Sequence, residues 1–380
     1  MRIAYTAGKM VEEYDGVTRV LFKWSEHLQN KNVPHIFISG EVPPKEKQSV
    51  PMYRVPSIPF PLYKEYPFSL PSPKTFDAVL NEFKPDIIHF NSPCPLAFAS
   101  LKYGRKHDIP VVSTYHTHFL SYAQYYKLKP FVEAGWMLYH HVYNQCAQVY
   151  VPSTPILHEL EAGGLNTLHF LPHGVDIDTF HPTFLSKSWK EQVGAQDKFV
   201  VLYAGRLVWE KNLRVLANVY NTLYPQRNDI AFVLAGDGPI RRELEQMMPD
   251  AIFLGHLNTK QVATAFASSD AFIFPSKTET FGNVTLEAMA CGNVPICAAA
   301  GGTLDLIRNE ENGFLIEPDD ASGFAAAIRA LADDPSLRNT FAERALAFAQ
   351  QQSWDVIVER MLNFYSDAIH HVPCGTTQAA

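Results

Sequence analysis

A stretch in the second half of the chain has residues that suit the binding of a phosphate group. Residues 270–275 form an apolar run that predicts a buried strand, and residues 284–290 are predicted to be a helix that Gly292 ends. Gly282 and Asn283 lie where the loop becomes the helix. Backbone N–H groups at a helix start have no partners within the helix, so they form a site for an anion such as phosphate.

Two glutamates bracket the predicted helix start. Glu279 precedes it, and Glu287 lies about one turn inside the helix. A carboxylate accepts paired hydrogen bonds from neighbouring hydroxyl groups. Phosphate-binding amides between two such carboxylates fit a sugar nucleotide, with the sugar at one end and the ribose at the other. The alternative is that both glutamates are solvated surface charges, which is common for this residue type.

This pattern resembles the E-x7-E motif of the retaining family 4 glycosyltransferases. The resemblance continues through residues 292–295 and 300–302, and it covers nearly the whole chain from Asp15 to Trp354. It implies an α/β protein with the GT-B fold, in which two Rossmann-like β/α/β domains face a cleft. In that family the first glutamate contacts the donor sugar and the second contacts the ribose.

Length and composition are those of a globular chain with two domains. The chain has 380 residues, of which 47% are hydrophobic and 19% charged. The net charge of −7 argues against a general nucleic-acid binder. The first 172 residues carry a net charge of +2 and the remainder −9, so the mildly basic first part could face an anionic membrane.

Cysteine usage and the lack of a long apolar segment favour a cytoplasmic location. The five cysteines form no C-x-x-C pair, which suggests reduced thiols. The first residues enter a predicted strand without the apolar region of a signal peptide. No run of apolar residues is long enough for a transmembrane helix. We therefore expect membrane contact, if any, to be peripheral and on the inner face.

Residues 1–172 are predicted to form an N-terminal, acceptor-binding domain with a parallel sheet covered by helices on both faces. Ligands of such sheets bind at the carboxyl ends of the strands. Gly16 ends the loop before the helix predicted for residues 18–30. A glycine at this place either allows a phosphate group to approach the backbone or simply forms a turn. The predicted strands are 2–6, 35–39, 87–90, 111–115 and 149–151.

His116 follows the strand predicted for residues 111–115. The resemblance assigns His116 to the donor sugar. The His116-x-His118 pair also resembles two metal ligands, but no third ligand is evident in the sequence, so no metal is expected.

Three segments of the first domain bear on the acceptor. Prolines extend residues 42–73, which we interpret as a long surface loop that either receives acceptor or forms an irregular edge. Residues 122–145 are rich in aromatic and basic side chains, which suits either a membrane interface or a buried core helix. With residues 83–89 and 113–118, this segment resembles sulfoquinovosyl-diacylglycerol synthases and glycolipid mannosyltransferases, which favours a lipid acceptor.

Residues 172–182 resemble the family's crossing between the domains, and residues 173–355 are predicted to form the C-terminal, nucleotide-sugar-binding domain. Asp176 and Asp178 match an Asp-x-Asp metal signature, but in a turn-rich linker we interpret them as turn and capping residues. A terminal helix over about 356–375 is expected to return to the first domain. The strands predicted for the second domain are 199–204, 231–235, 252–254, 271–274 and 295–298.

Arg206 leaves the end of the first strand of this domain, and Lys211 lies at the start of the following helix. Both cations can reach a diphosphate, or they are ordinary surface charges. Their context resembles the pyrophosphate site of the family. By the same resemblance, the loops at Gly236 and at His256-Leu257 lie near the nucleobase.

The resemblance implies transfer of a hexosyl group from a UDP- or GDP-sugar, with retention, to a lipid or saccharide acceptor. No metal cofactor is required in this interpretation. A soluble saccharide or polyol acceptor and a GT-B sugar-nucleotide epimerase remain the alternatives. The residues expected to act in catalysis are His116, Arg206, Lys211 and Glu279. The residues expected to bind the donor are Gly16, Arg206, Lys211, Gly236, His256, Leu257, Glu279, Phe281, Gly282, Asn283, Val284 and Glu287.

Overall fold

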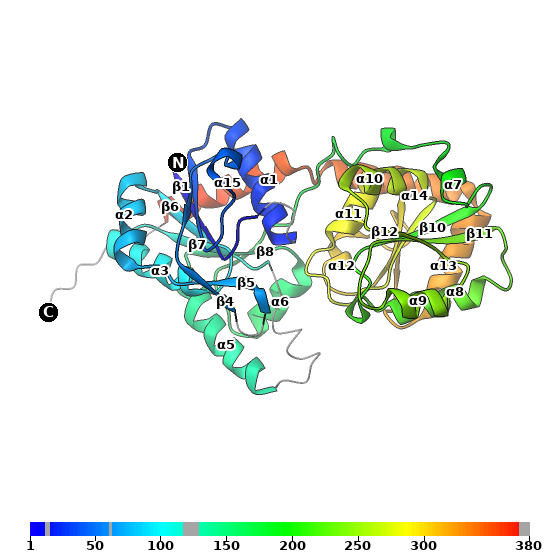
Figure 1. The fold of residues 1–380 in the computed structure, drawn as a ribbon, viewed down its shortest axis with the longest axis horizontal. Helices are drawn as coiled ribbons and strands as arrows, with labels where there is room; N and C mark the ends of the chain where they lie inside the picture. Colours follow the sequence, from blue (N-terminus) through cyan, green and yellow to red (C-terminus); the bar gives the residue numbers. More distant parts are fainter. Residues whose placement is uncertain (12–15, 61–62, 117–128, 372–380) are drawn as a thin grey trace. The chain divides into compact units, whose positions relative to one another are not determined.

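The protein is described by a computed structural model, which covers residues 1–11, 16–60, 63–116 and 129–371 (Figure 1). The chain forms two compact units: the first contains residues 1–172 and the C-terminal residues from 354 onward, and the second contains residues 173–353. Each unit is built on one parallel sheet with helices, so the predicted α/β class with two Rossmann-like units is confirmed.

The first unit has a seven-stranded sheet in the order β3-β2-β1-β6-β7-β8-β9, in which every neighbouring pair is parallel. Strand side chains alternate between two cores: Ala4 packs on one face, and Ile3 and Tyr5 pack on the other. The strands are β1 (Ile3–Ala7), β2 (His35–Ser39), β3 (Met52–Arg54), β6 (Ile87–Phe90), β7 (Val111–Thr114), β8 (Gln148–Val151) and β9 (Leu168–Phe170).

Helices cover both faces of this sheet. The core on one face contains side chains of α2, α3, α5 and α6, and the core on the other contains side chains of α1 and α15. The helices of the unit are α1 (Gly16–Asn30), α2 (Pro73–Phe83), α3 (Pro95–His107), α5 (Lys129–Tyr143), α6 (Thr154–Ala162) and α15 (Trp354–His370), with the 3-10 helix η1 (Lys45–Lys47).

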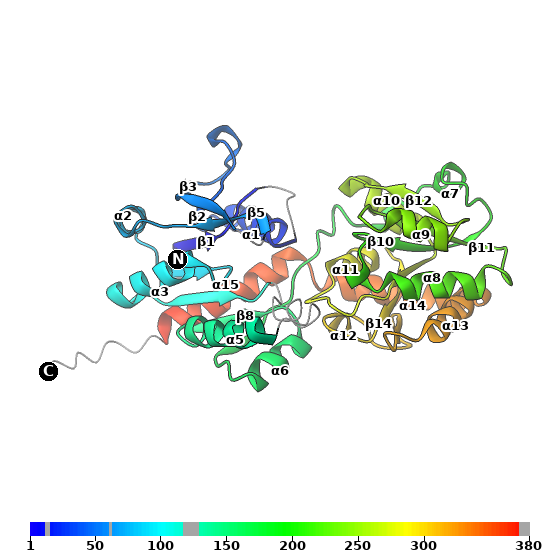
Figure 2. The same ribbon diagram turned by 60° about the horizontal axis from the view of Figure 1, so that its bottom comes forward.

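The terminal helix α15 belongs to the first unit, as predicted. It packs against α1 and lies beside the strands of the unit (Figure 2). Ile357 and Tyr365 are buried in the shared core, and His27 Nδ1 lies 2.9 Å from Asp355 Oδ1. The helix begins two residues before the predicted start, and the residues predicted beyond 371 lie outside the described part of the chain.

The interpretation of residues 42–73 as a long surface loop was wrong. This segment contains β3 and an antiparallel hairpin of β4 (Ser57–Phe60) and β5 (Tyr63–Ser69). The backbones of Pro59 and Pro67 pair with each other in the hairpin. Proline donates no backbone hydrogen bond, but a two-stranded sheet has only edge strands, where proline is tolerated.

Part of the aromatic segment 122–145 is a core helix. Tyr139 and Tyr143 of α5 are 2% exposed and pack around Tyr115, with ring centroids 5.6 and 5.9 Å from the Tyr115 ring. Met137 of the same helix is 68% exposed. Residues 117–128, which include His118 and the first part of the segment, lie outside the described residues. No helix in the described ranges is long and apolar enough to span a bilayer.

A buried polar network joins α15 to the first sheet. His89 is fully buried, its Nδ1 is hydrogen-bonded to the Tyr365 hydroxyl, and its Nε2 lies 2.9 Å from Thr114 Oγ1. The Tyr365 hydroxyl is also 3.1 Å from the Tyr5 hydroxyl. Burial lowers the pKa of His89 to about 3, because an imidazolium there would lose its hydration.

The free energy of unfolding is expected to fall as the pH decreases because of His89. The folded-state pKa of about 3 lies below that of an unfolded histidine, so this stabilisation is complete above pH ~6.5 and is lost as the pH falls toward 3. The loss amounts to about 2 kcal/mol at pH 5. Urea unfolding at pH 7 and pH 5 measures it. His89→Phe should reduce the pH dependence by this amount, and exposed His371→Asn should not; an unchanged dependence in His89→Phe would disprove the assignment.

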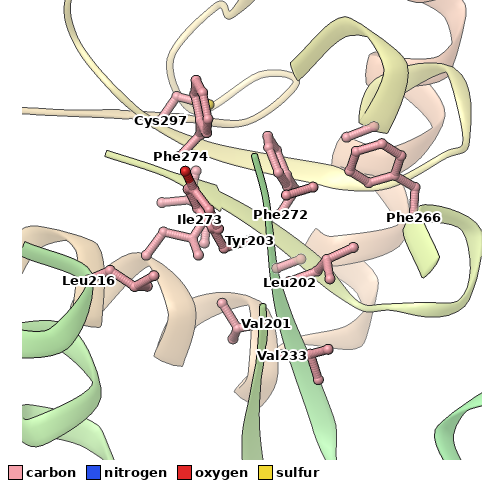
Figure 3. Packing of buried hydrophobic residues seen from close by; sticks show 14 of the residues in the cluster. Val201, Leu202, Tyr203, Leu216, Val233, Phe266, Phe272, Ile273, Phe274 and Cys297 are labelled. Atoms are coloured by element: carbon pink, nitrogen blue, oxygen red, sulfur yellow. The ribbon is translucent and has the colours of Figure 1, made fainter. Parts of the chain in front are cut away.

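The second unit has a six-stranded parallel sheet in the order β12-β11-β10-β13-β14-β15. The central strands are continuous apolar runs because both of their faces are buried. In Figure 3 the side chains of Tyr203, Phe272 and Phe274 lie among other apolar groups of this core. The strands are β10 (Phe199–Ala204), β11 (Ile230–Ala235), β12 (Ile252–Gly255), β13 (Ala271–Phe274), β14 (Val294–Ala298) and β15 (Phe314–Ile316).

Helices connect successive strands up to β15, and α13 and α14 follow it. The helices α8, α13 and α14 contribute buried residues to the single core of the unit. The helices are α7 (Trp189–Gln192), α8 (Leu213–Leu223), α9 (Arg241–Met247), α10 (Thr259–Ser268), α11 (Asn283–Ala290), α12 (Thr303–Leu306), α13 (Ala321–Asp333) and α14 (Pro335–Gln350), with the 3-10 helices η2 (Pro182–Phe184) and η3 (Trp209–Lys211).

The Asp-x-Asp sequence in the crossing segment forms a turn. Asp176 Oδ1 accepts hydrogen bonds from the backbone N–H groups of Asp178 and Thr179, at 3.2 and 3.0 Å. Asp176 Oδ2 accepts the Thr179 hydroxyl at 2.8 Å. These bonds confirm the interpretation of Asp176 as a turn residue.

Candidate active site

The carboxyl ends of β10 and β13 form the centre of the candidate site. The strand order of the second sheet reverses between these paired strands, and ligands of open parallel sheets bind at such a switch point. The loop after β10 leads to η3, which ends at Lys211. The loop after β13 carries Glu279 and leads into α11. The sheet thus brings together two site residues that are 68 positions apart in the sequence.

Lys211 and Glu279 form an ion pair between these two loops. The Lys211 Nζ donates to Glu279 Oε1, and the two side chains are 23% and 16% exposed. The same ammonium group lies 5.8 Å from the centre of the Phe274 ring. A partly buried pair of this kind is screened less by water than a surface pair. The two residues were predicted to contact different parts of the ligand, and their mutual contact was not predicted.

The start of α11 is fixed by close backbone packing. Gly282 has φ 98° and ψ 48°, a left-handed conformation that favours glycine. The backbone N–H of Gly302 donates to the Glu279 carbonyl at 3.0 Å, and a Cβ on Gly302 would lie 2.3 Å from the Phe281 Cα. Glycine is therefore required where the loop after β14 packs against the backbone of Glu279 and Phe281. Val284 is half-buried in the first turn of α11.

His173 contacts the first residue of α11. Its Nδ1 lies 2.9 Å from Asn283 Oδ1, and its ring centroid is 5.1 Å from that of Phe281. Burial lowers the pKa of His173 to about 4, so the imidazole is neutral at neutral pH. His173 was not among the predicted site residues, because nothing in the turn-rich crossing segment indicates a contact with a helix 110 residues later.

Arg206 lies at the carboxyl end of β10 with an exposed side chain. Its carbonyl oxygen accepts the Tyr203 hydroxyl at 3.0 Å, and the N–H of the next residue, Leu207, donates to the Asp237 carbonyl at 3.0 Å. These bonds hold the backbone of the loop while the guanidinium group faces solvent. This exposed guanidinium, five residues before Lys211, can turn toward an incoming phosphate.

The loops after β10, β11 and β12 are in close contact. Gly236 has φ 135°, and a Cβ there would lie 2.0 Å from the Gly205 carbonyl oxygen. The N–H of Gly236 donates to the Gly255 carbonyl at 2.8 Å. His256 is exposed and Leu257 half-buried directly after Gly255. The three loops thus lie side by side at one edge of the sheet, where the nucleobase is predicted to bind.

Glu287 lies in α11, four residues after Asn283, and is half-buried. Residues four apart lie on one face of a helix, so Glu287 follows Asn283 one turn further from the helix start. Its carboxylate also contributes to a raised pKa of the Cys291 thiol, which is about 12 chiefly because of burial. The role of Glu287 at the ribose stays a prediction.

Two predicted residues belong to the first unit. His116 follows β7 and is 7% exposed, and its Nε2 lies 3.0 Å from the side-chain oxygen of Asn91, which follows β6. The Trp24 ring centroid is 5.7 Å from that of His116. Gly16 is the exposed first residue of α1, and a Cβ there would meet no atom within 4 Å. Both lie in segments that follow carboxyl ends of strands in the first sheet.

Asp319 ties together the two loops that carry Lys211 and Glu279. It follows β15, its Oδ2 accepts Lys277 Nζ at 2.6 Å, and its Oδ1 accepts Asn212 Nδ2 at 3.3 Å. The hydrogen bond from Lys277 lowers the pKa of the Asp319 carboxyl. Asp319 was not predicted as a site residue, because its partners are 42 and 107 residues away in the sequence.

Within the described ranges, no three His, Cys, Asp or Glu side chains lie together as a metal site. Lys211 reaches the loop before α11 through its ion pair with Glu279, and Arg206 is an exposed cation in the same loop as Lys211. The described site therefore offers cations and backbone amides toward a diphosphate, and a carboxylate at Glu279 toward hydroxyl groups.

Comparison with known proteins assigns a family. Residues 186–348 match the family described as glycosyl transferases group 1, and residues 14–179 match Glycosyltransferase Family 4. The chain is similar to a GDP-mannose-dependent alpha-mannosyltransferase of Corynebacterium glutamicum, with 33% identity over 97% of this chain and 89% of that protein. It is also 34% identical to the sulfoquinovosyl transferase SQD2 of Arabidopsis thaliana over 82% of this chain and 63% of the relative.

A solved structure supports the fold. The crystal structure of Anabaena HepE in complex with UDP has a TM-score of 0.79 to this chain and 20% sequence identity, over 97% of this chain and all of HepE. At this identity the likeness concerns the fold. The matched families and the relative from Corynebacterium together show that the chain belongs to the family 4 glycosyltransferases, with the GT-B fold.

Proposed function

We propose that the protein transfers a hexosyl group from a nucleoside-diphosphate sugar to a hydroxyl group of a lipid or glycolipid, with retention of the anomeric configuration. The observation that carries the proposal is the Lys211–Glu279 pair at the switch point of the second sheet, beside the start of α11. A cation, the first backbone amides of a helix and a carboxylate lie close together in these loops. A sugar diphosphate needs these groups in this order.

In the proposed complex, the diphosphate lies between the two cations Arg206 and Lys211 and the first amides of α11. Negative charge grows on the diphosphate as the sugar leaves, and groups already in place stabilise that charge without reorganisation. Glu279 binds hydroxyl groups of the sugar and Glu287 those of the ribose. The role of His116 at the donor sugar stays a prediction.

The reaction exchanges one C–O bond for another at the anomeric carbon. The bond from that carbon to the β-phosphate oxygen breaks, and the bond to the acceptor oxygen forms on the same face of the sugar. The proton of the acceptor hydroxyl passes to an oxygen of the leaving diphosphate. The protein supplies orientation and charge in this scheme and no nucleophile. Because Arg206 and Lys211 offset the phosphate charge, the scheme requires no metal ion.

GDP-mannose is the first donor to test. The relatives from Corynebacterium glutamicum and Mycolicibacterium smegmatis are named GDP-mannose-dependent alpha-mannosyltransferases, and they are 33% and 29% identical to this chain. The lipid acceptor is supported by the sequence resemblance of residues 83–89, 113–118 and 122–145 to glycolipid-forming enzymes.

The test uses the full chain with GDP-mannose, UDP-glucose and UDP-sulfoquinovose. A bound donor stabilises the fold, so a thermal shift identifies it. The identified donor is then incubated with a glycolipid in detergent micelles or with the matching free saccharide, and NMR gives the anomeric configuration of the product. We expect an α-linked lipid product. An inverted product would contradict retention, transfer only to the free saccharide would contradict the lipid acceptor, and complete conversion of donor without acceptor would indicate an epimerase.

A further inference from the structure

Ser276 is a buried residue of the candidate site whose hydroxyl is hydrogen-bonded to Glu279. It follows Phe274 and Pro275 at the carboxyl end of β13, and it is fully buried. Its hydroxyl donates to Glu279 Oε1 at 2.9 Å. A buried hydroxyl that donates to a carboxylate makes a stronger bond than one between neutral groups. Ser276 therefore restrains the side chain of the residue predicted to bind the sugar.

Both contacts of the Glu279 carboxylate converge on one oxygen. Oε1 accepts Ser276 Oγ and Lys211 Nζ, while Oε2 accepts no hydrogen bond from the part of the chain that the structure describes. The described hydrogen bonds to the carboxylate thus all go to Oε1. Oε2 is left to accept hydrogen bonds from a ligand.

The backbone of Glu279 is fixed independently of its side chain. Its carbonyl oxygen accepts the N–H of Gly302 at 3.0 Å, and a Cβ on Gly301 would lie 2.2 Å from the same oxygen. The loop that holds Ser276 is also tied down, because Lys277 pairs with Asp319 at 2.6 Å. Both ends of the Ser276–Glu279 hydrogen bond are therefore anchored.

Binding of the sugar nucleotide is expected to affect the two hydrogen bonds to Glu279 Oε1 differently. Lys211 is at the end of η3 on another loop, and a diphosphate would compete with Glu279 for its ammonium group. Ser276 is buried in the same loop as Glu279 and has no such competitor. When Lys211 takes up the diphosphate, Ser276 still holds the carboxylate.

We propose that Ser276 is a positioning residue, which holds Glu279 Oε1 so that Oε2 binds a hydroxyl group of the donor sugar. This inference rests on the proposed function, because it assigns a task within the same site. It predicts that removing the Ser276 hydroxyl lowers kcat only for donors that carry the sugar hydroxyl bound by Glu279. The binding of the nucleoside diphosphate should stay unchanged.

The test compares Ser276→Ala and Ser276→Cys with the wild-type enzyme, using GDP-mannose and its monodeoxy analogues. We expect Ser276→Ala to lower kcat about tenfold, with little change in the KM for donor or in the affinity for GDP. The thiol of Ser276→Cys is a weaker hydrogen-bond donor than a hydroxyl, so the kcat of this variant should lie between those of the wild type and Ser276→Ala. The deoxy analogue that lacks the hydroxyl bound by Glu279 should react equally slowly with wild type and Ser276→Ala.

Ser268→Ala is the matched control. Ser268 is a buried serine of the same unit, and its hydroxyl accepts the backbone N–H of Ser186 at 3.0 Å, so its loss should leave kcat unchanged. The positioning role would be overturned if Ser276→Ala lowered kcat by the same factor with GDP-mannose and with every deoxy analogue. A wild-type kcat in a folded Ser276→Ala protein would overturn it as well. A wild-type enzyme that transfers sugar from none of the donors would instead contradict the proposed function.

Discussion

Replacing Glu279 with alanine is expected to lower kcat/KM for transfer by about 100-fold or more, which corresponds to ~3 kcal/mol of transition-state stabilisation. The substitution removes the carboxylate that we propose orients the sugar, while the cations and the start of α11 remain. Affinity for GDP should therefore change little. Steady-state kinetics with the identified donor and isothermal titration with GDP measure the two effects separately.

Glu279→Gln and Glu243→Ala provide the controls. Glutamine keeps the shape and can still accept one hydrogen bond, so we expect a smaller loss than with alanine. Glu243 is an exposed glutamate of α9, and its replacement should have no effect. Near-wild-type transfer by a folded Glu279→Ala protein would show that Glu279 does not bind the sugar.

Replacing Lys211 with alanine is expected to lower transfer by a similar factor, about 100-fold, but through a different step. Lys211 is proposed to hold the diphosphate, so its loss should also weaken the binding of GDP, which has no sugar. The substitution leaves Glu279 without its ion-pair partner, although Ser276 still donates to the same oxygen. Kinetics and GDP titration on one preparation test both expectations.

The contrast between the two variants is the sharper test. Lys211→Ala should weaken GDP binding and Glu279→Ala should not. Lys260, an exposed lysine of α10, gives a matched charge control, because Lys260→Ala removes the same charge from the same unit without touching the site. If Lys260→Ala and Lys211→Ala weakened GDP binding equally, the effect would be one of overall charge.

Four strands of the second unit, β10, β11, β13 and β14, were predictable because they are buried on both faces. β10 and β13 were predicted at their observed bounds, and β11, β12 and β14 to within one residue. A continuous apolar run between turn residues is a strong local signal. The three-residue strands β3, β9 and β15 were missed, since so short a segment becomes a strand only by pairing with its neighbour in the folded sheet.

The site residues also fall into those that could be predicted from the sequence and those that could not. The spacing of Glu279 and Glu287 and the residues Arg206 and Lys211 are visible in the sequence, because each lies next to a predicted strand end or helix start. Ser276, His173 and Asp319 were missed. Ser276 is close to Glu279 in sequence, but its burial under the carboxylate depends on how the loop packs; His173 and Asp319 meet their partners only through the tertiary fold.

The most direct measurement is a crystal structure of the full chain with bound GDP-mannose. The account predicts a pyrophosphate within hydrogen-bond distance of Lys211 Nζ and the Arg206 guanidinium, at the start of α11, and a sugar hydroxyl on Glu279 Oε2. Pyrophosphate density away from both cations, or a sugar with no contact to Glu279, would contradict it.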